Sequence, residues 1–429
     1  CPSPAAVALA PSREHTGQMT ATLDIDDLSA IFARLPRNPR VVVSGNAATP
    51  TSVIGVLDRT VGEYTLHMLN AMSELPDRAG VTLETAFVGP AMRGKANLRY
   101  VPCRLSLLPL LYQRNLRPDI VIAHTSVPRT GTVSLGIEVN VLPAAIEAAR
   151  ARGAVVIAAV NPAMPYTGGD AVMRLEDFDF LVEVDDSLLS FAPTEPDQTS
   201  LTIGGLISEH IPAGSTLQLG IGGVPDAVLG ALGESRDLKI WSETISDGVL
   251  TLKQLGALSR DAPVRTSFIM GSERLYEWVD QNPQVMMIRT ETCNSPAQIA
   301  GNPSMISVNG AIEIDLHGQV NASRVRGRVY SGFGGSTDFI VGAIHSAGGQ
   351  SFMALPSWHP KADTSTIVAA LACPATSFQQ TAVVTENGIA WLFGASETEQ
   401  ASNLIEHSAH PRARDQLRDA AEQMFSNAW

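Results

Sequence analysis

The sequence predicts an α/β protein built from two similar open α/β domains with mainly parallel sheets. The chain has 429 residues, more than one hydrophobic core of ordinary size accommodates. Short, continuously apolar runs alternate with longer amphipathic stretches, which is typical of parallel strands covered by helices on both faces. A strand, a glycine turn and a helix also occur twice with the same spacing, which favours two related domains.

The first half of the chain supplies alternating strands and helices. Buried strands are predicted at residues 40–44, 119–123, 154–160 and 180–184. Pro50 ends a turn and suits the start of a helix over residues 51–57. Residues 141–152 predict an alanine-rich helix with two arginines near its end, where positive charge is favoured.

Residues 192–198 are polar, contain two prolines and lack periodicity, which indicates a linker. After it we expect a helix at 203–210, a strand at 215–219 and a further short apolar strand at 238–240. We interpret Met19 as the true start. The expected divisions are an N-terminal extension at 1–18, a first domain at 19–192 and a second domain at 199–429.

The repeat consists of an apolar strand, a glycine turn and the pattern Pro-x-x-Val-(Ile/Leu)-Gly-(Val/Ala)-Leu, which begins at Pro50 and again at Pro225. Only the second copy has the dense glycines Gly220, Gly222 and Gly223. The site is therefore expected in the second domain, with the first domain contributing a wall.

Composition excludes several functions. A formal net charge of −13 without a Lys/Arg run argues against a nucleic-acid partner. The glycine turn lacks the dinucleotide fingerprint, and no P-loop is present. Cysteine and histidine spacing predicts reduced thiols and no metal site. No apolar run is long enough to cross a membrane, and no targeting segment is recognised, so we expect a cytoplasmic protein.

Glu243 follows the apolar run 238–240 and is expected just past a strand end, facing the glycine turn of the neighbouring strand. A second dense glycine loop occupies residues 331–339 and includes Gly334 and Gly335. Glycine loops let backbone N–H groups approach a ligand or a developing oxyanion. A purely structural glutamate and a tight turn without a ligand are the alternatives at this point.

Seven short motifs, in this order, resemble those of the acetyl-CoA hydrolase/CoA-transferase family, particularly its 4-hydroxybutyrate and butyryl-CoA:acetate transferases. The resemblance extends from about residue 40 to residue 413. The motifs occupy residues 160–170, 220–228, 242–248, 318–322, 331–339, 384–390 and 409–411.

The resemblance implies CoA transfer between an acyl-CoA and a small carboxylic acid, by way of a covalent intermediate on a glutamate, without a permanently bound cofactor. Three glutamates compete for the role of nucleophile. The position of Glu243 after the glycine turn favours it over Glu386 and Glu313, which are expected to be structural or supporting. The residues implied for oxyanion stabilisation and CoA binding are Ile221, Gly222, Gly223, Gly334 and Gly335. Candidates for the substrate pocket are Trp241, Asp338 and Glu386.

Some positions depart from the family pattern. Trp241 stands where the family usually has His, residues 126–131 lack an Asp, and two arginines are missing from segments 364–368 and 377–380. These differences bear on the acyl group and on CoA affinity. Two alternatives stay open, an acyl-CoA hydrolase on the same residues and a catalytically reduced acyl-CoA-binding protein. The resemblance also implies a homodimer or a larger homo-oligomer.

Overall fold

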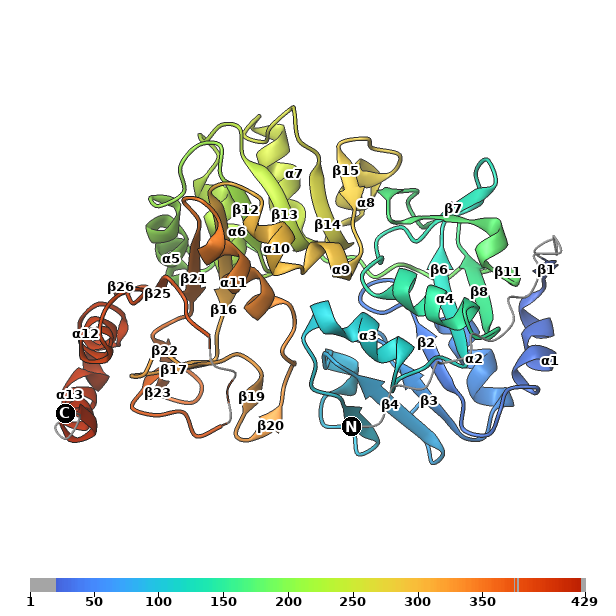
Figure 1. The fold of residues 1–429 in the computed structure, drawn as a ribbon, viewed down its shortest axis with the longest axis horizontal. Helices are drawn as coiled ribbons and strands as arrows, with labels where there is room; N and C mark the ends of the chain where they lie inside the picture. The colour runs from blue at the N-terminus through green and yellow to red at the C-terminus, as the bar shows by residue number, and fades with distance from the viewer. Residues whose placement is uncertain (1–20, 374, 376–377, 426–429) are drawn as a thin grey trace, which may run out of the picture.

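The structure is a computed structural model that describes residues 21–373, 375 and 378–425. The expected extension at 1–18, Met19 and Cys1 lie outside the described residues. Two large sheets lie side by side, the first drawn in blue to green and the second in green to red (Figure 1). This arrangement confirms the predicted fold class of two open, mainly parallel α/β units.

The first sheet is parallel throughout and has the order β1-β11-β8-β6-β2-β3-β4-β5. Its interior strands are continuously apolar, as expected for strands covered on both faces. The strand bounds are β1 (Ala21–Leu23), β2 (Arg40–Val43), β3 (Tyr64–His67), β4 (Val81–Thr85), β5 (Leu98–Tyr100), β6 (Ile120–Thr125), β8 (Val155–Val160) and β11 (Phe180–Glu183).

The second sheet has the order β26-β25-β21-β16-β12-β13-β14-β15-β9 and is parallel except between β25 and β26. Its edge strand β9 comes from the first half of the chain and pairs with β15. The strand bounds are β9 (Gly168–Gly169), β12 (Thr216–Leu219), β13 (Lys239–Ile245), β14 (Val264–Ile269), β15 (Val285–Met287), β16 (Met305–Gly310), β21 (Gln350–Ala354), β25 (Ala382–Thr385) and β26 (Gly388–Trp391).

Helices cover both faces of each sheet, and short hairpins decorate the second half. The helices are α1 (Leu28–Phe32), α2 (Thr51–Thr60), α3 (Leu108–Gln113), α4 (Leu142–Arg150), α5 (Gln198–Ser208), α6 (Gly223–Ala231), α7 (Asp247–Gln254), α8 (Glu273–Val279), α9 (Thr290–Cys293), α10 (Pro296–Ala300), α11 (Ser336–His345), α12 (Glu397–Asn403) and α13 (Arg414–Phe425). The small pairings are β7 (Thr132–Ser134) with β10 (Val172–Arg174), β17 (Glu313–Asp315) with β18 (Val320–Asn321) and β24 (Ile367–Val368), β19 (Arg324–Val325) with β20 (Arg328–Val329), and β22 (Trp358–His359) with β23 (Thr364–Ser365). None of the helices described is both long and apolar enough to cross a membrane.

The repeated sequence pattern occupies the same place in both sheets. β2 lies between β6 and β3, and β12 lies between β16 and β13. From β12 the chain steps to β13 and β14 on one side, then returns to β16 and β21 on the other. Right-handed crossovers place the helices of these two directions on opposite faces. The turns after β2 and β12 therefore stand where the strand order reverses, which is the usual ligand position in an open α/β sheet.

Two expected boundaries need correction. α5 begins at Gln198 rather than at residue 203, because the side chain of Asp197 accepts a hydrogen bond from Ser200 N and caps the helix. β13 runs on through Glu243 to Ile245, so this residue lies inside the strand and not past its end. The extension follows from pairing with β14, which continues as far as Ile245 opposite Ile269.

The two halves share one continuous apolar cluster that includes Ile137 and Phe268. The segment 137–140 of the first half runs beside the free end of β14, and Glu138 bridges Phe268 in antiparallel fashion. Two N–H groups of this segment, those of Val139 and Asn140, donate to Ser267 O at 3.1 Å. The first half thus supplies side chains directly beside β14, the neighbour of β13. The boundaries 19–192 and 199–429 stay predictions.

Candidate active site

Glu243 is the fifth residue of β13 and is half-buried. Asn294, directly after α9, donates from Nδ2 to Glu243 Oε2 at 2.6 Å. Asn294 is itself fully buried, so its amide is held in place. One oxygen of the carboxylate is therefore fixed by a short hydrogen bond.

The environment of Glu243 raises its pKa from 4.5 to about 7. Desolvation is the largest cause, because the surrounding protein replaces the water that would stabilise the charge. The negative charge of Asp338 raises the pKa further, whereas the Asn294 hydrogen bond opposes both effects. A carboxylate that is poorly solvated yet ionised near neutral pH is suited to nucleophilic attack.

The loop 331–335 approaches both Glu243 and Asn294 at Gly335. A Cβ at Gly335 would overlap Glu243 Oε2 and Asn294 Nδ2, so only glycine leaves room for this pair. The same loop is anchored to the first half of the chain. Val88 N donates to Ser331 O at 2.8 Å, and Phe87 bridges Gly332. Gly334, with φ +59°, accepts a hydrogen bond on its carbonyl oxygen from Leu105 N at 3.1 Å and makes the turn into α11.

Asp338 lies in the first turn of α11 and is buried. Ser106 Oγ donates to Asp338 Oδ1 at 2.9 Å, and Arg104 Nη1 lies 3.8 Å from the same oxygen. Burial raises the Asp338 pKa to about 6, and the contacts with Ser106 and Arg104 lower it. Asp338 Oδ2 has no hydrogen-bond partner among the described residues. The charge of Asp338 acts on Glu243, and its contacts with Ser106 and Arg104 place it at the junction of the two halves.

The turn of Ile221, Gly222 and Gly223 opens α6 beside β13. Their backbone N–H groups donate to no other described residue. Gly222 has φ +131°, a conformation that requires glycine. Continuing the register in which Leu217 lies opposite Ile240 places Gly220 opposite Glu243. No hydrogen bond joins this turn to the Glu243 carboxylate in the part of the chain that the structure describes.

Trp241 lies two residues before Glu243 on the same face of β13, but deeper. Its indole is buried, and Nε1 donates to Cys293 O at 2.9 Å. It belongs to an apolar cluster with Phe339 of α11, and Arg265 lies 5.6 Å from its ring centroid. These contacts favour the packing interpretation of Trp241.

Glu386 lies in the β25–β26 turn. Ser357 N donates to its Oε2 at 2.9 Å, and Ser357 Oγ donates to its Oε1. β25 is four strand positions from β13, which corresponds to about 19 Å at the usual strand spacing. Glu313 of β17 accepts a hydrogen bond from Asn321 Nδ2 at 3.2 Å. The structure therefore brings Glu243, Gly335 and Asp338 together and places Glu386 farther along the same sheet.

Sequence reasoning missed three polar residues near Glu243, namely Asn294, Asn46 and Glu138. Glu138 is buried, and Asn46 Nδ2 donates to its Oε2 at 2.7 Å. Burial raises the Glu138 pKa to about 8, Asn46 lowers it, and the charge of Glu243 raises it. Asn46 lies in the turn of the first repeat, whereas Glu138 and Asn294 belong to no motif or periodic pattern. For Glu138 the only sequence signal is an acidic residue inside the largely apolar run 135–142.

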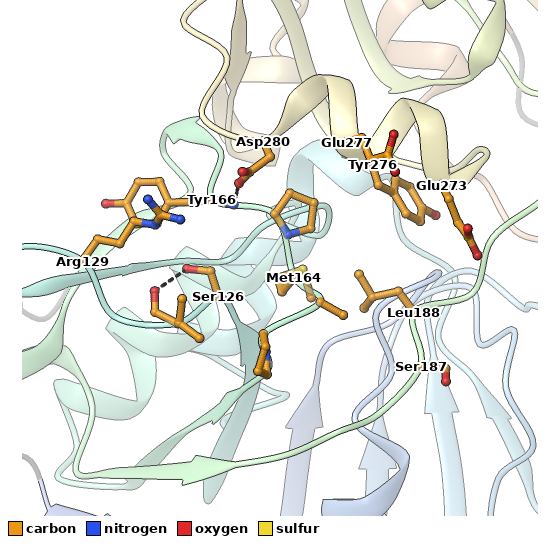
Figure 2. A pocket seen from close by; sticks show the side chains of 14 residues that line it. Ser126, Arg129, Met164, Tyr166, Ser187, Leu188, Glu273, Tyr276, Glu277 and Asp280 are labelled. Carbon is orange, nitrogen blue, oxygen red and sulfur yellow. Dashed lines mark hydrogen bonds between the residues drawn. The ribbon is translucent and has the colours of Figure 1, made fainter.

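A cavity of about 550 Å³ opens elsewhere between the halves. Figure 2 shows α8 on one side, with Glu273, Tyr276 and Glu277, and loops of the first half on the other, with Arg129 and Tyr166. Its lining includes neither Glu243 nor another of the site residues predicted from the sequence. Its wall at 162–166 comes from the first of the seven motifs.

Comparison with known proteins gives a consistent result. Residues 271–421 match the family model described as acetyl-CoA hydrolase/transferase C-terminal domain. The 4-hydroxybutyrate coenzyme A transferase of Clostridium kluyveri is 32% identical over 416 residues, covering 92% of this chain and 96% of that protein. A solved 4-hydroxybutyrate CoA-transferase from Porphyromonas gingivalis superposes with a TM-score of 0.80 and 30% identity, covering 94% and 98% of the two chains. An acetyl-CoA hydrolase of Schizosaccharomyces pombe is 30% identical over 258 residues, or 56% of this chain and 49% of that protein.

Proposed function

Because the chain belongs to the acetyl-CoA hydrolase/transferase family, it is a CoA-transferase, and we propose that it transfers CoA through covalent intermediates on Glu243. The substrates are an acyl-CoA thioester and a small carboxylic acid. The observation that carries the assignment is the Glu243 carboxylate itself: it is half-buried, accepts a short hydrogen bond from Asn294, lies against Gly335 and has a pKa raised to about 7.

The exchange proceeds in balanced steps. A Glu243 oxygen attacks the thioester carbonyl, the C–S bond breaks, and an acyl-glutamyl anhydride and CoA thiolate form. The thiolate then attacks the glutamyl carbonyl, releasing the first acid as a carboxylate and leaving a glutamyl–CoA thioester. The acceptor carboxylate reverses both steps and leaves as its CoA ester. No proton is consumed, and the thioester free energy is conserved.

Each tetrahedral intermediate places negative charge on a carbonyl oxygen. The unpaired N–H groups of Ile221, Gly222 and Gly223 lie at the start of α6, beside the strand that carries Glu243. Preorganised donors of this kind typically lower the activation barrier by about 3 kcal/mol each. We assign oxyanion stabilisation to this turn, together with the loop that contains Gly334 and Gly335.

The CoA phosphates require positive charge on a chain of net charge −13. The β19–β20 hairpin carries Arg324, Arg326 and Arg328, none of which forms an ion pair with a described residue. The hairpin leads directly into the loop that contacts Glu243. Arginine is well suited to bind phosphate. We therefore assign the phosphate-bearing end of CoA to this hairpin.

Hydrolysis is the second candidate activity, favoured by the partial solvent exposure of Glu243 and by the similar acetyl-CoA hydrolase. Water would then intercept the anhydride or the glutamyl thioester. Release of free acid and free CoA in the absence of an acceptor acid would support hydrolysis. Strict dependence of acyl-CoA turnover on an acceptor would exclude it.

For the cellular setting we propose a cytoplasmic homo-oligomer. Cys103, Cys293 and Cys373 are free thiols, as is usual in a reducing compartment. Trp391 is 41% exposed on the edge strand β26, and Phe393 just beyond it is 58% exposed, so this edge offers apolar surface to a second copy. Analytical ultracentrifugation tests the assembly, and a purely monomeric protein at micromolar concentration would rule it out.

The decisive experiment is incubation with a panel of acyl-CoAs without acceptor, followed by mass analysis of proteolytic peptides. We expect a CoA adduct on the peptide that contains Glu243, and its loss in Glu243→Ala. An adduct on the peptide that contains Glu386 would overturn the assignment. Glu63→Gln, at an exposed carboxylate on the first sheet's surface, serves as the control and should exchange CoA at the wild-type rate.

A further inference from the structure

A second carboxyl group reaches the Glu243 region from the first half of the chain. Glu138 is 2% exposed and lies in the segment that pairs with the end of β14, the strand beside β13. The charge on Glu243 acts on Glu138, although no hydrogen bond joins the two side chains. The mechanism above assigns this carboxyl group no role.

Two amides orient the Glu138 carboxyl. Asn70 Nδ2 donates to Asn46 Oδ1 at 2.8 Å, which turns the Asn46 Nδ2 group toward Glu138 Oε2, 2.7 Å away. Asn46 and Asn70 both lie just beyond strands, at positive φ of 47° and 45°. Glu138 Oε2 therefore accepts the hydrogen bond from Asn46 Nδ2. Glu138 Oε1 remains as the oxygen on which a proton can reside.

The charges around Glu138 favour a neutral carboxyl. The charge of Glu243 on β13 acts on Glu138. Glu138 in turn acts on the buried Tyr112 of α3, as do Glu84, Cys103 and Glu291. No Lys or Arg forms an ion pair with Glu138 or Glu243 within the described residues, and Arg104 and Arg289 pair with other carboxylates. Those pairs are Arg104 with Asp338, and Arg289 with Glu147 and Glu291. Burial and the Glu243 charge together raise the Glu138 pKa to about 8.

We propose that Glu138 is a positioning residue that keeps its proton throughout CoA transfer, as a neutral acid held by Asn46 beside Glu243. The inference rests on the proposed function. During exchange a single negative charge moves between Glu243, the CoA thiolate and the free carboxylate. An ionised Glu138 would add a second negative charge in the same poorly solvated region and oppose every one of these states.

The proton stays on Glu138 Oε1, so no step of the exchange gains or loses one. The active enzyme is then the form in which this pair of carboxyl groups holds one proton. The rate should rise with pH as Glu243 ionises, near 7, and fall as Glu138 ionises, near 8. These two apparent values belong to the coupled pair and not to either residue alone.

The test compares pH profiles of kcat/KM for acyl-CoA in wild type, Glu138→Gln and Glu138→Ala. Gln keeps a neutral side chain that can accept from Asn46, but it cannot ionise. We expect Glu138→Gln to keep the rising limb and lose the alkaline decline, which in wild type amounts to about tenfold per pH unit above about pH 8. Glu138→Ala should lose at least tenfold at all pH values.

The outcomes separate the two proposals. Absence of a CoA adduct on Glu243 in wild type refutes the proposed function. An adduct with a Glu138→Gln profile that superposes on wild type refutes the role of Glu138, and so does a folded Glu138→Gln that is inactive at every pH. If Glu138→Gln does not fold, the infrared carbonyl band of protonated carboxyl groups at pH 7.5 decides. This band is measured in the wild type and in Glu243→Gln, which lacks the other titrating group. Absence of a protonated buried carboxyl overturns the proposal.

Discussion

The reactivity of Glu243 depends on the balance between burial and a single hydrogen bond. Burial and Asp338 raise its pKa, and the amide of Asn294 lowers it. A hydrogen bond to a charged group contributes about 1.5–3 kcal/mol, which corresponds to between one and two pH units. Asn294 therefore helps to set the fraction of ionised Glu243 at neutral pH.

Replacing Asn294 by Ala should raise the Glu243 pKa above 7 and shift the acid limb of the rate profile to higher pH. We expect at least a tenfold loss of CoA transfer at pH 7, partly recovered toward pH 8, measured as kcat/KM across pH. A loss of the same size at every pH would contradict this role and indicate that Asn294 acts by another route.

Gly335 has φ −103°, so its backbone would accept any residue, and only the space beside Glu243 and Asn294 requires glycine. Gly335→Ala should displace that pair and lower the transfer rate by about a hundredfold or more, with an unchanged circular dichroism spectrum. Gly230→Ala in α6 is the matched control, because nothing lies within 4 Å of its added Cβ. The control should stay active and gain about 1 kcal/mol in stability. Full activity of Gly335→Ala would show that the close approach is unimportant.

Among the elements, the β19–β20 hairpin and the loop that follows it contact both halves of the protein. Arg93 Nε donates to Tyr330 O at 2.8 Å, and its guanidinium lies 3.8 Å from the Tyr330 ring centroid. The hairpin is thereby held on the first half, while the next loop contacts Glu243. Its position suits an extended ligand such as CoA, whose phosphates and thiol are far apart.

Changing Arg324, Arg326 and Arg328 together to Ser should raise the KM for acyl-CoA at least tenfold while changing kcat less than threefold, because phosphate contacts act on binding. The effect should shrink with acyl-pantetheine, which lacks the nucleotide, and the KM of the wild type should rise with salt. Lys253→Ser on α7 is the control for loss of a surface charge. An unchanged KM in the triple variant would move the phosphate site elsewhere.

At the scale of the whole molecule, three carboxyl groups with raised pKa values gather at the junction of the halves. Glu138, Glu243 and Asp338 all have pKa values raised by burial. An acid whose folded pKa exceeds its unfolded pKa binds its proton more tightly in the native state. Its contribution to stability is therefore present at low pH and is lost as pH rises through that window.

For Glu138 the window extends from 4.5 to about 8. The free energy of unfolding of the wild type should fall with rising pH there, with Glu138 contributing up to roughly 1.4 kcal/mol per pH unit. Glu138→Gln removes this contribution, so its Tm relative to wild type should increase from pH 5 to pH 8. Parallel Tm curves for the two proteins would show that Glu138 titrates normally.

Much of this architecture could be read from local patterns. Continuous apolar runs separated by amphipathic stretches specify parallel strands and covering helices, and the repeat at Pro50 and Pro225 specifies two similar units. These signals act over a few residues and survive without tertiary context. The glycine turn and Glu243 became candidate site residues for the same reason, because their spacing is short and ordered. The span of β13 was not, since its last residues are held by pairing with β14.

Only the tertiary structure decided which side chains surround Glu243. Asn294 lies 51 residues from it in sequence and Glu138 lies 105 residues away, and neither has a local signature. Their proximity results from the crossover to α9 and from the docking of segment 137–140 on β14. The need for glycine at 335 and the burial of Trp241 likewise depend on neighbours distant in the chain. Local periodicity determines the elements, whereas the electrostatics of the site arise from contacts that form only when the two halves come together.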